Sequence, residues 1–156
     1  MIIRPALKND LPRINELRHQ VSELHYSARP DMFIPGFPQE ISDYLQVMFN
    51  ADDRQIIVAE MNNQIVAFAC LAEIKTPATP YRPARHYLEV DEIGVDESVR
   101  RQGVGRKMFE KIRYIAMKKG FKRIELNMWD FNEDALKFYE AIGFNTYRRY
   151  MEMEIQ

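Results

Sequence analysis

Cysteine is nearly absent from this chain, which has a single one, Cys70, among 156 residues. One cysteine excludes an internal disulfide framework and a zinc site built from cysteines. Long apolar runs are missing as well, because the longest, from Ile65 to Ala72, is far shorter than the roughly 20 residues of a membrane-spanning helix. Lys8 and Asp10 interrupt any signal-peptide core at the N-terminus. These absences predict a soluble, cytoplasmic protein.

The chain also lacks an excess of either charge. Its 22 Lys and Arg residues nearly balance 23 Asp and Glu residues, for a net charge of −1. Dedicated nucleic-acid binders usually carry a basic excess, so this balance argues against a nucleic-acid partner. The composition, 46% apolar and 29% charged, is typical of a globular protein, and the length fits one domain over residues 1–156.

Apolar periodicity predicts short strands alternating with helices, with no internal repeat. Asn62-Asn63 predicts a hairpin turn, and Gly120 and Gly143 are expected to end helices. This organisation favours an α/β or α+β domain. The expected strands are 1–6, 55–61, 64–74, 86–95 and 123–129, the expected helices are 10–24, 38–50, 103–119 and 133–142, and 144–155 is expected to be extended.

The segment after the predicted strand at 86–95 is the most informative. A short turn leads into a helix that begins on Gly103-Val104-Gly105. Glycines at a helix start let backbone N–H groups approach a ligand, and the helix dipole there favours an anion such as phosphate. The same pattern also fits a solvated glycine-rich turn, and it lacks the features of a Walker loop or a dinucleotide fingerprint. Three arginines add charged donors for phosphate oxygens: Arg100, Arg101 and Arg106.

A second motif follows the next predicted strand and reads Asn132-x-x-Ala135-x-x-Phe138-Tyr139-x-x-x-Gly143-Phe144. Together, the two segments resemble the GCN5-related N-acetyltransferase (GNAT) superfamily. The first matches the family's acetyl-CoA loop, Gln/Arg-x-x-Gly-x-Gly/Ala, at Arg100, Gly103 and Gly105. The second matches the family's closing motif at every named position.

The resemblance implies a fold, a cofactor and a reaction. The fold is a mixed, mostly antiparallel sheet of about six to seven strands with about four helices and splayed central strands. The reaction moves an acetyl group from acetyl-CoA to a primary amine of a small molecule or peptide, by direct attack in a ternary complex and with no metal. A homodimer through the C-terminal strands is compatible with such a domain, and no membrane partner is expected.

The resemblance also assigns cofactor contacts. The pantetheine arm would pair with the strand backbone of Ile93, Gly94 and Val95, and Gly94 is consistent with close backbone approach or a bulge. The pyrophosphate would lie on the amides from Gln102 to Arg106. Asn132 would reach the cofactor from the start of the last helix, where it also reads as an ordinary N-cap.

Two proton transfers need an acid and a base. Tyr139 matches the family's acid, although its helical face fits core packing equally well. Glu89 is the first choice of base and Glu92 the second, but each also reads as a solvated strand residue. Strict alternation separates Glu89 and Asp91 from Glu92, unless a bulge changes the parity. Other relatives use a carboxylate on the following strand, where this chain has Asn127.

The acceptor pocket is expected at two loops, between the first two helices and at residues 75–86. Two other functions remain open: an acyl-CoA-binding sensor without catalysis, and a protein that binds another nucleotide phosphate at the Gly-x-Gly turn. Cys70 lies in an apolar strand without an adjacent base and reads as a core residue. The side chains that these loops offer are His25, Tyr26, Arg29, Asp31, Phe33, Tyr81, Arg82, Arg85 and His86.

Overall fold

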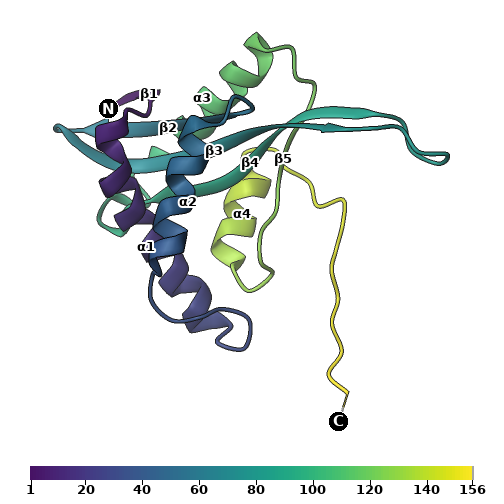
Figure 1. Ribbon diagram of the computed structural model, residues 1–156, viewed down its shortest axis with the longest axis horizontal. Helices are drawn as coiled ribbons and strands as arrows, with labels where there is room; N and C mark the ends of the chain where they lie inside the picture. The colour runs from purple at the N-terminus through teal and green to yellow at the C-terminus, as the bar shows by residue number, and fades with distance from the viewer. Residues whose placement is uncertain (156) are drawn as a thin grey trace.

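The computed structural model describes residues 1–155, and its centre is a five-stranded sheet in the order β1-β2-β3-β4-β5 (Figure 1). Consecutive strands from β1 to β4 pair antiparallel, whereas β4 and β5 pair in parallel. The strands are β1 (Ile2–Pro5), β2 (Arg54–Met61), β3 (Gln64–Thr76), β4 (Arg85–Val95) and β5 (Ile124–Leu126). The helices are α1 (Leu11–Ala28), α2 (Gln39–Asn50), α3 (Val104–Lys118) and α4 (Glu133–Ala141), with short 3₁₀ turns η1 (Lys8–Asp10) and η2 (Glu97–Val99).

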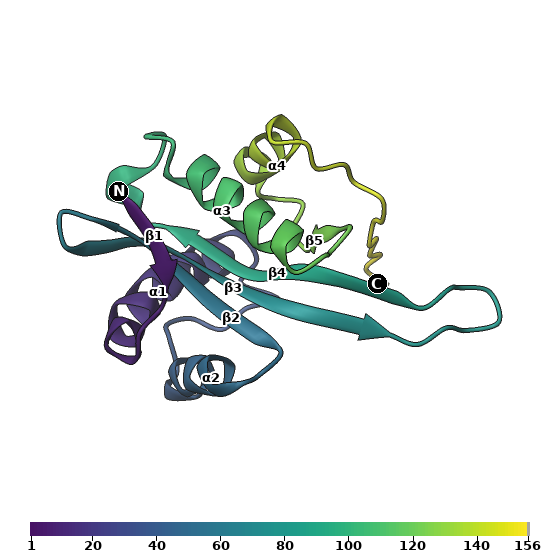
Figure 2. The ribbon, with the colours of Figure 1, turned by 90° about the horizontal axis from the view of Figure 1, so that it is seen from above.

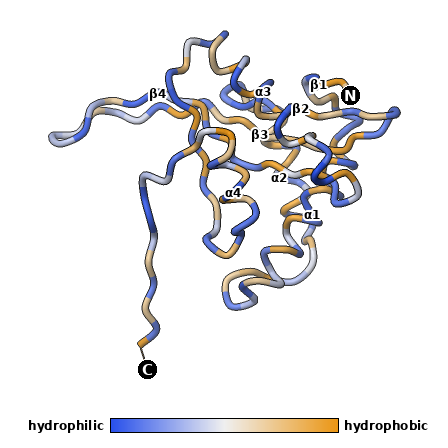
Figure 3. The backbone as a smooth tube through the Cα atoms, turned by 180° about the vertical axis from the view of Figure 1, so that it is seen from behind, coloured by the Kyte–Doolittle hydropathy of each residue, from blue (hydrophilic) through white to orange (hydrophobic). Residues whose placement is uncertain are grey.

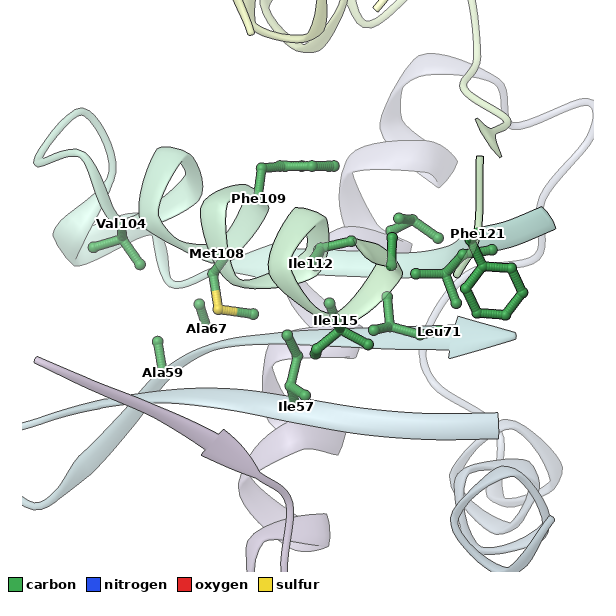
Figure 4. Close-up of a cluster of buried hydrophobic side chains, with 14 of the residues drawn as sticks. Ile57, Ala59, Ala67, Leu71, Val104, Met108, Phe109, Ile112, Ile115 and Phe121 are labelled. Carbon is green, nitrogen blue, oxygen red and sulfur yellow. The ribbon is translucent and has the colours of Figure 1, made fainter. Parts of the chain in front are cut away.

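Helices cover both faces of the sheet, with α3 and α4 on one face and α1 and α2 on the other (Figure 2). Strand β2 explains this arrangement, because its side chains alternate between the faces. Ile57 packs in the cluster that contains Met108 and Ile112 of α3 (Figure 4), whereas Ile56 packs in the cluster of α1 and α2. Both faces of the central strands are therefore buried.

The predicted α+β fold and its alternating elements are confirmed. Asn62 and Asn63 have φ values of 50° and 60°, as a two-residue hairpin turn requires. Gly120 and Gly143 also have positive φ, at the ends of α3 and α4. Among the helices described in residues 1–155, none is long and apolar enough to cross a membrane.

Two predictions about strands are wrong. The sheet has five strands rather than six or seven, and β5 is limited to Ile124–Leu126 instead of extending over 123–129. The C-terminal tail (residues 145–155) is extended, as its sequence predicts, but it leaves α4 and runs beside the body without joining the sheet (Figures 1 and 3). A strand exists only where another edge accepts its backbone hydrogen bonds, and the tail has no such edge within residues 1–155.

Candidate active site

The parallel strands β4 and β5 pair over only three residues each and then separate. β4 pairs with β5 only from Leu88 to Val90, opposite Ile124 to Leu126. Beyond Val90, β4 continues to Val95 with no partner on that side among residues 1–155. Ile93 and Val95 therefore face the opening with backbone groups that no strand in residues 1–155 pairs, as the expected splay requires, and the Val95 carbonyl accepts a hydrogen bond from Arg100 Nε at 3.2 Å.

A bulge at Asp91 sets which side chains face which side of β4. Leu71 pairs with Val90 and Cys70 pairs with Glu92, so Asp91 is the extra residue. The bulge shifts the parity of the strand. Strict alternation, which separates Glu89 from Glu92, therefore fails, and the two glutamates share the side that faces α1.

Glu92 forms a two-point ion pair with Arg18 of α1. The Arg18 Nε donates to one carboxylate oxygen at 2.6 Å and Nη2 donates to the other at 2.9 Å. Arg18 is only 5% exposed, and its Nη1 donates to Asn15 Oδ1 and to the Ile41 carbonyl. Both oxygens of Glu92 are thus occupied, which makes it a structural anchor between the sheet and α1.

Glu89 lies where β4 and β5 begin to separate and has a different environment. Its Oε1 accepts one long hydrogen bond, 3.4 Å, from Asn127 Nδ2 on the chain just after β5. Partial burial, followed by the charges of Asp91 and Glu125, raises the pKa of Glu89, while Arg54 opposes this shift. A carboxylate whose pKa is raised is a better proton acceptor near neutral pH, so Glu89 is the better-suited base of the two.

Gly94 is buried because Phe68 fills the space beside it. A Cβ at this position would lie 2.6 Å from Phe68 Cε1 and 3.3 Å from Val21 Cγ2. The close approach expected at Gly94 is therefore with the core of the α1 face, whereas the bulge lies at Asp91. Any larger residue at 94 would displace Phe68 from its packed position.

Asp96 fixes the turn between β4 and α3. Its Oδ1 accepts hydrogen bonds from the Ser98 backbone N–H at 3.0 Å and from the Ser98 hydroxyl at 2.7 Å. Its other oxygen pairs with Arg13 of α1. Burial works against the charge of Asp96, but these hydrogen bonds and the Arg13 guanidinium lower its pKa. The turn is thus held at its base by a buried carboxylate.

The start of α3 leaves a row of backbone donors free. The first hydrogen bond of the helix runs from Lys107 N–H to the Gly103 carbonyl at 3.2 Å. Within residues 1–155, the N–H groups of 102–106 donate to no acceptor. Arg101 and Gly103 have φ values of 63° and 80°, the left-handed backbone conformation found in anion-binding turns. Converging donors at a helix N-terminus form an anion-binding geometry.

The second motif brings α4 against this turn. Phe138 packs on Gly105, where a Cβ would lie 3.2 Å from the ring. Arg101 and Asp134 approach to 3.9 Å on the surface. Asn132 is the N-cap of α4, and its side-chain oxygen accepts from the Ala135 N–H at 3.2 Å. This capping bond leaves the amide nitrogen of Asn132 available as a donor.

Tyr139 of α4 packs against aromatic side chains of α3 and of the segment that follows α4. Its ring makes edge contacts with Phe109 and Phe144, with centroids 5.7 and 5.8 Å apart. Burial raises the pKa of Tyr139 to about 12. Within residues 1–155, its hydroxyl has no hydrogen-bond partner, and yet it is not sealed from solvent. Tyr139 therefore packs in the core, and its raised pKa keeps the unpaired hydroxyl protonated near neutral pH.

An aromatic wall (His25, Phe33, Trp129 and Phe131) lies on the α1 side of the opening. His25 stacks on Phe33 at 5.0 Å, and Phe33 meets Trp129 edge-on at 5.0 Å. Phe131 completes the group with an edge contact to His25 at 5.7 Å. Burial lowers the pKa of His25, although the nearby Glu92 charge opposes this effect. The aromatic wall thus places flat side chains near the face of β4 that carries Glu89 and Glu92.

The second loop expected at the acceptor pocket lies elsewhere. The β3–β4 hairpin projects far past the sheet, and its tip stands away from the α1–α2 loop (Figures 1 and 2). His86 bonds to Glu73 at 2.9 Å and packs edge-on against Phe121. The aromatic side chains near the opening come instead from α1, the α1–α2 loop and the β5–α4 loop.

Sequence reasoning missed the two ion pairs and half of the aromatic wall. Arg13 and Arg18 are far in sequence from Asp96 and Glu92, so no local pattern links them. Trp129 could have been singled out from the sequence, because it is the only tryptophan and lies between a predicted strand and a predicted helix. Cys70 was placed correctly in the core, where burial raises its pKa well above the usual range and suppresses thiolate chemistry.

Comparisons with known proteins agree with this geometry. A model described as the acetyltransferase (GNAT) family matches residues 18–144. L-ornithine N5-acetyltransferase NATA1 of Arabidopsis thaliana is 26% identical, covering 95% of this chain and 81% of that protein. The uncharacterized N-acetyltransferase MJ1207 of Methanocaldococcus jannaschii is 29% identical over 65% of this chain, and the match spans 43% of that relative. Bovine thialysine N-epsilon-acetyltransferase is 37% identical over 36% of this chain and 32% of its own length.

Solved structures share the whole fold. A mutant of the BH1408 protein from Bacillus halodurans has a TM-score of 0.95, 29% identity and 100% coverage of both chains. The aminoglycoside N-acetyltransferase AAC(6')-Iy in complex with CoA has a TM-score of 0.76 at 18% identity, covering 99% of this chain and 94% of its own. The family model spans most of the chain, including the strand, the loop and the α4 motif described above. The chain belongs to the GNAT acetyltransferase family.

Proposed function

We propose that this protein is an acetyl-CoA-dependent N-acetyltransferase that acts on a primary amine of a small molecule or peptide. The observation that carries the proposal is the opening between β4 and β5. It ends at the free amides before α3, Glu89 lies on β4, and Tyr139 of α4 packs against the same hydrophobic cluster as Ile93 and Val95. Anion binding, proton acceptance and proton donation thus surround one gap.

The donor set fits acetyl-CoA. The unpaired edge of 93–95 suits the amides of a pantetheine arm, and the N–H groups of 102–106 suit a pyrophosphate. Arg100, Arg101 and Arg106 supply positive charge on the exposed side, and the Asn132 amide nitrogen is left free by its cap. When bound, acetyl-CoA supplies an activated thioester.

Glu89 and Tyr139 divide the proton transfers. Glu89 takes the proton that the amine loses as its nitrogen bonds to the acetyl carbon. Tyr139 gives a proton to the sulfur as the carbon–sulfur bond breaks. One proton is taken and one is given, and solvent exchange resets both groups. Glu92 holds α1 against the bulge and stays paired with Arg18.

The acceptor is proposed to be a small amine with a short, flexible chain. The aromatic wall offers flat faces that attract a cationic substrate, and Glu92 lies close enough to affect the pKa of His25. Two relatives are named for amines of this kind, L-ornithine and thialysine. We therefore expect amino-acid side-chain amines to be better acceptors than peptide N-termini.

The test measures thiol release with acetyl-CoA and a panel of amines: L-ornithine, L-lysine, thialysine, a polyamine, an aminoglycoside and a short peptide. Mass spectrometry must find the acetylated amine, so that slow hydrolysis is not counted as transfer. We expect transfer to at least one side-chain amine and its loss in Glu89→Gln. Tight acetyl-CoA binding without transfer to any amine would replace this proposal with the sensor function.

A further inference from the structure

Arg29, the residue that follows α1, holds two carboxylates at once. Its Nε and Nη2 donate to the two oxygens of Asp31 at 2.8 and 2.7 Å. Its Nη1 and Nη2 donate to the two oxygens of Glu152 at 2.7 and 3.1 Å. Both contacts are two-point pairs, with Asp31 on the side edge of the guanidinium and Glu152 on its end edge. One positive charge therefore serves two negative charges.

The two carboxylates are held in different ways. Asp31 is only two residues from Arg29, in the same loop. Glu152 belongs to the C-terminal tail, which within residues 1–155 makes no backbone hydrogen bond and is otherwise bonded to the body through the Tyr147 hydroxyl on Glu125, at 2.8 Å. The Glu152 side chain is 66% exposed, and an exposed ion pair on such a chain contributes little free energy. The end edge of Arg29 thus carries the carboxylate that is more easily displaced.

Arg29 adjoins the aromatic wall. Its backbone N–H donates to the His25 carbonyl at 2.9 Å, and its own carbonyl accepts from the Phe33 N–H at 3.0 Å. His25 and Phe33 are the stacked pair of that wall, which lies near the face of β4 that carries Glu89 and Glu92. The tail and the α1–α2 loop extend toward the same end of the molecule (Figures 1 and 3). The guanidinium is therefore on the side of the proposed acceptor.

We propose that Arg29 determines specificity by binding the α-carboxylate of an amino-acid acceptor, in the place that Glu152 occupies until the acceptor displaces it. This inference rests on the proposed function, because the side-chain amine of the same acceptor receives the acetyl group. A free carboxylate offers the same two oxygens as the Glu152 side chain, so it accepts both end-edge hydrogen bonds. Asp31 keeps the side edge and holds the guanidinium in position.

Charge balance favours this exchange. With Glu152 in place, one guanidinium and two carboxylates leave one negative charge in excess. An amino acid brings an α-carboxylate and an α-ammonium together, so the local charges cancel when it replaces Glu152. The corresponding diamine carries the same reacting amine but has no carboxylate for the guanidinium. The site should therefore prefer amino acids to diamines.

Matched acceptors test the proposal on the full chain, because L-ornithine and putrescine, like L-lysine and cadaverine, differ only by one carboxylate. We expect a lower KM for the amino acid of each pair. Arg29→Gln should raise the KM of L-ornithine by about tenfold or more, with kcat little changed, and should affect putrescine far less. Arg29→Lys keeps the charge but loses the two-point fork, so it should recover only part of the preference.

Two changes in the tail test the role of Glu152. Glu152→Gln weakens the occupant of the end edge, so it should lower the KM of L-ornithine without changing that of putrescine. Arg148→Gln changes an exposed tail arginine that stacks on Tyr150, and it serves as the matched control that leaves both values unchanged.

Titration of L-ornithine into the protein with CoA present gives a readout that needs no turnover. The natural chain should bind L-ornithine about tenfold more tightly than Arg29→Gln does. Binding without transfer would refute the proposed function and leave the assignment of Arg29 standing. Transfer to amines with no preference for a carboxylate, or L-ornithine binding that Arg29→Gln does not weaken, would overturn the assignment, as would no L-ornithine binding at all.

Discussion

Arg18 and Glu92 join α1 to β4 through two hydrogen bonds, of 2.6 and 2.9 Å, to separate carboxylate oxygens. The guanidinium is almost entirely buried, and its remaining donors go to Asn15 and the Ile41 carbonyl. This pair fixes the wall of the opening on which Glu89 lies. The two glutamates therefore differ in environment, although they share a face of the strand: Glu92 is held by Arg18, whereas Glu89 has one long hydrogen bond, from Asn127.

Glu92→Gln should destabilise the fold. It removes the negative charge that balances a buried guanidinium and puts an NH2 donor in place of one acceptor oxygen, which costs about 2 kcal/mol or more for a partly exposed pair. Denaturant unfolding measures the loss, and the midpoint should fall without a change in slope. An unchanged midpoint together with abolished turnover would instead assign the base to Glu92.

Glu89→Gln should leave stability within about 0.5 kcal/mol, because its single hydrogen bond to Asn127 is long. Turnover should fall by about 10²- to 10⁴-fold, the usual contribution of a general base. Initial-rate kinetics with the best amine measures this. Glu40→Gln, an exposed carboxylate on α2, serves as the control and should retain full activity.

Tyr139→Phe keeps the ring and removes only the hydroxyl. The hydroxyl has no partner in residues 1–155, so neither stability nor acetyl-CoA affinity should change appreciably. Turnover should drop by about 10²-fold or more if the hydroxyl protonates the leaving sulfur. Full turnover in this variant would refute the acid role and leave Tyr139 as a packing residue.

Gly103→Ala should weaken acetyl-CoA binding by about tenfold. Its φ of 80° strains any other residue by about 1–2 kcal/mol and would turn the free amides away from their shared direction. Gly120→Ala provides the control, because that glycine has a φ of 77° and equally open surroundings at the far end of α3. Both variants should lose similar stability, but only Gly103→Ala should lose affinity, as calorimetry can measure.

The pH dependence of kcat/KM should show one rising limb from the enzyme. The pKa of Glu89 is raised, and a base acts when deprotonated, so activity should increase with pH through a value above the ordinary 4.5. The pKa of Tyr139 is about 12, so the acid stays protonated and no alkaline fall from it is expected below that pH. The pH profile of Glu89→Gln checks the assignment, because the rise that comes from Glu89 should be absent from it.

The sequence predicted the elements that local patterns determine. The helix start on Gly103, the turn at Asn62-Asn63 and the cap at Asn132 follow from backbone geometry that few other residues satisfy. The bulge at Asp91 was not predictable, because it depends on how β3 and β4 align. That one residue decides which acids share a face, so the base was left open.

Long-range pairing explains the remaining misses. Arg18 and Glu92 are 74 residues apart, and either one alone looks like an ordinary charged residue. The tail is extended, as predicted, but an extended pattern does not say which sheet edge will accept it. Within residues 1–155, no strand of the sheet pairs with the tail.

Isothermal titration with acetyl-CoA, with ATP as a parallel control, tests the central claim most directly. Our account predicts micromolar affinity for acetyl-CoA, about −8 kcal/mol, and no binding of ATP. The affinity should fall in Gly103→Ala and persist in Tyr139→Phe. Absence of acetyl-CoA binding to the natural chain, or equal binding of ATP, would contradict both the assigned cofactor and the reaction built on it.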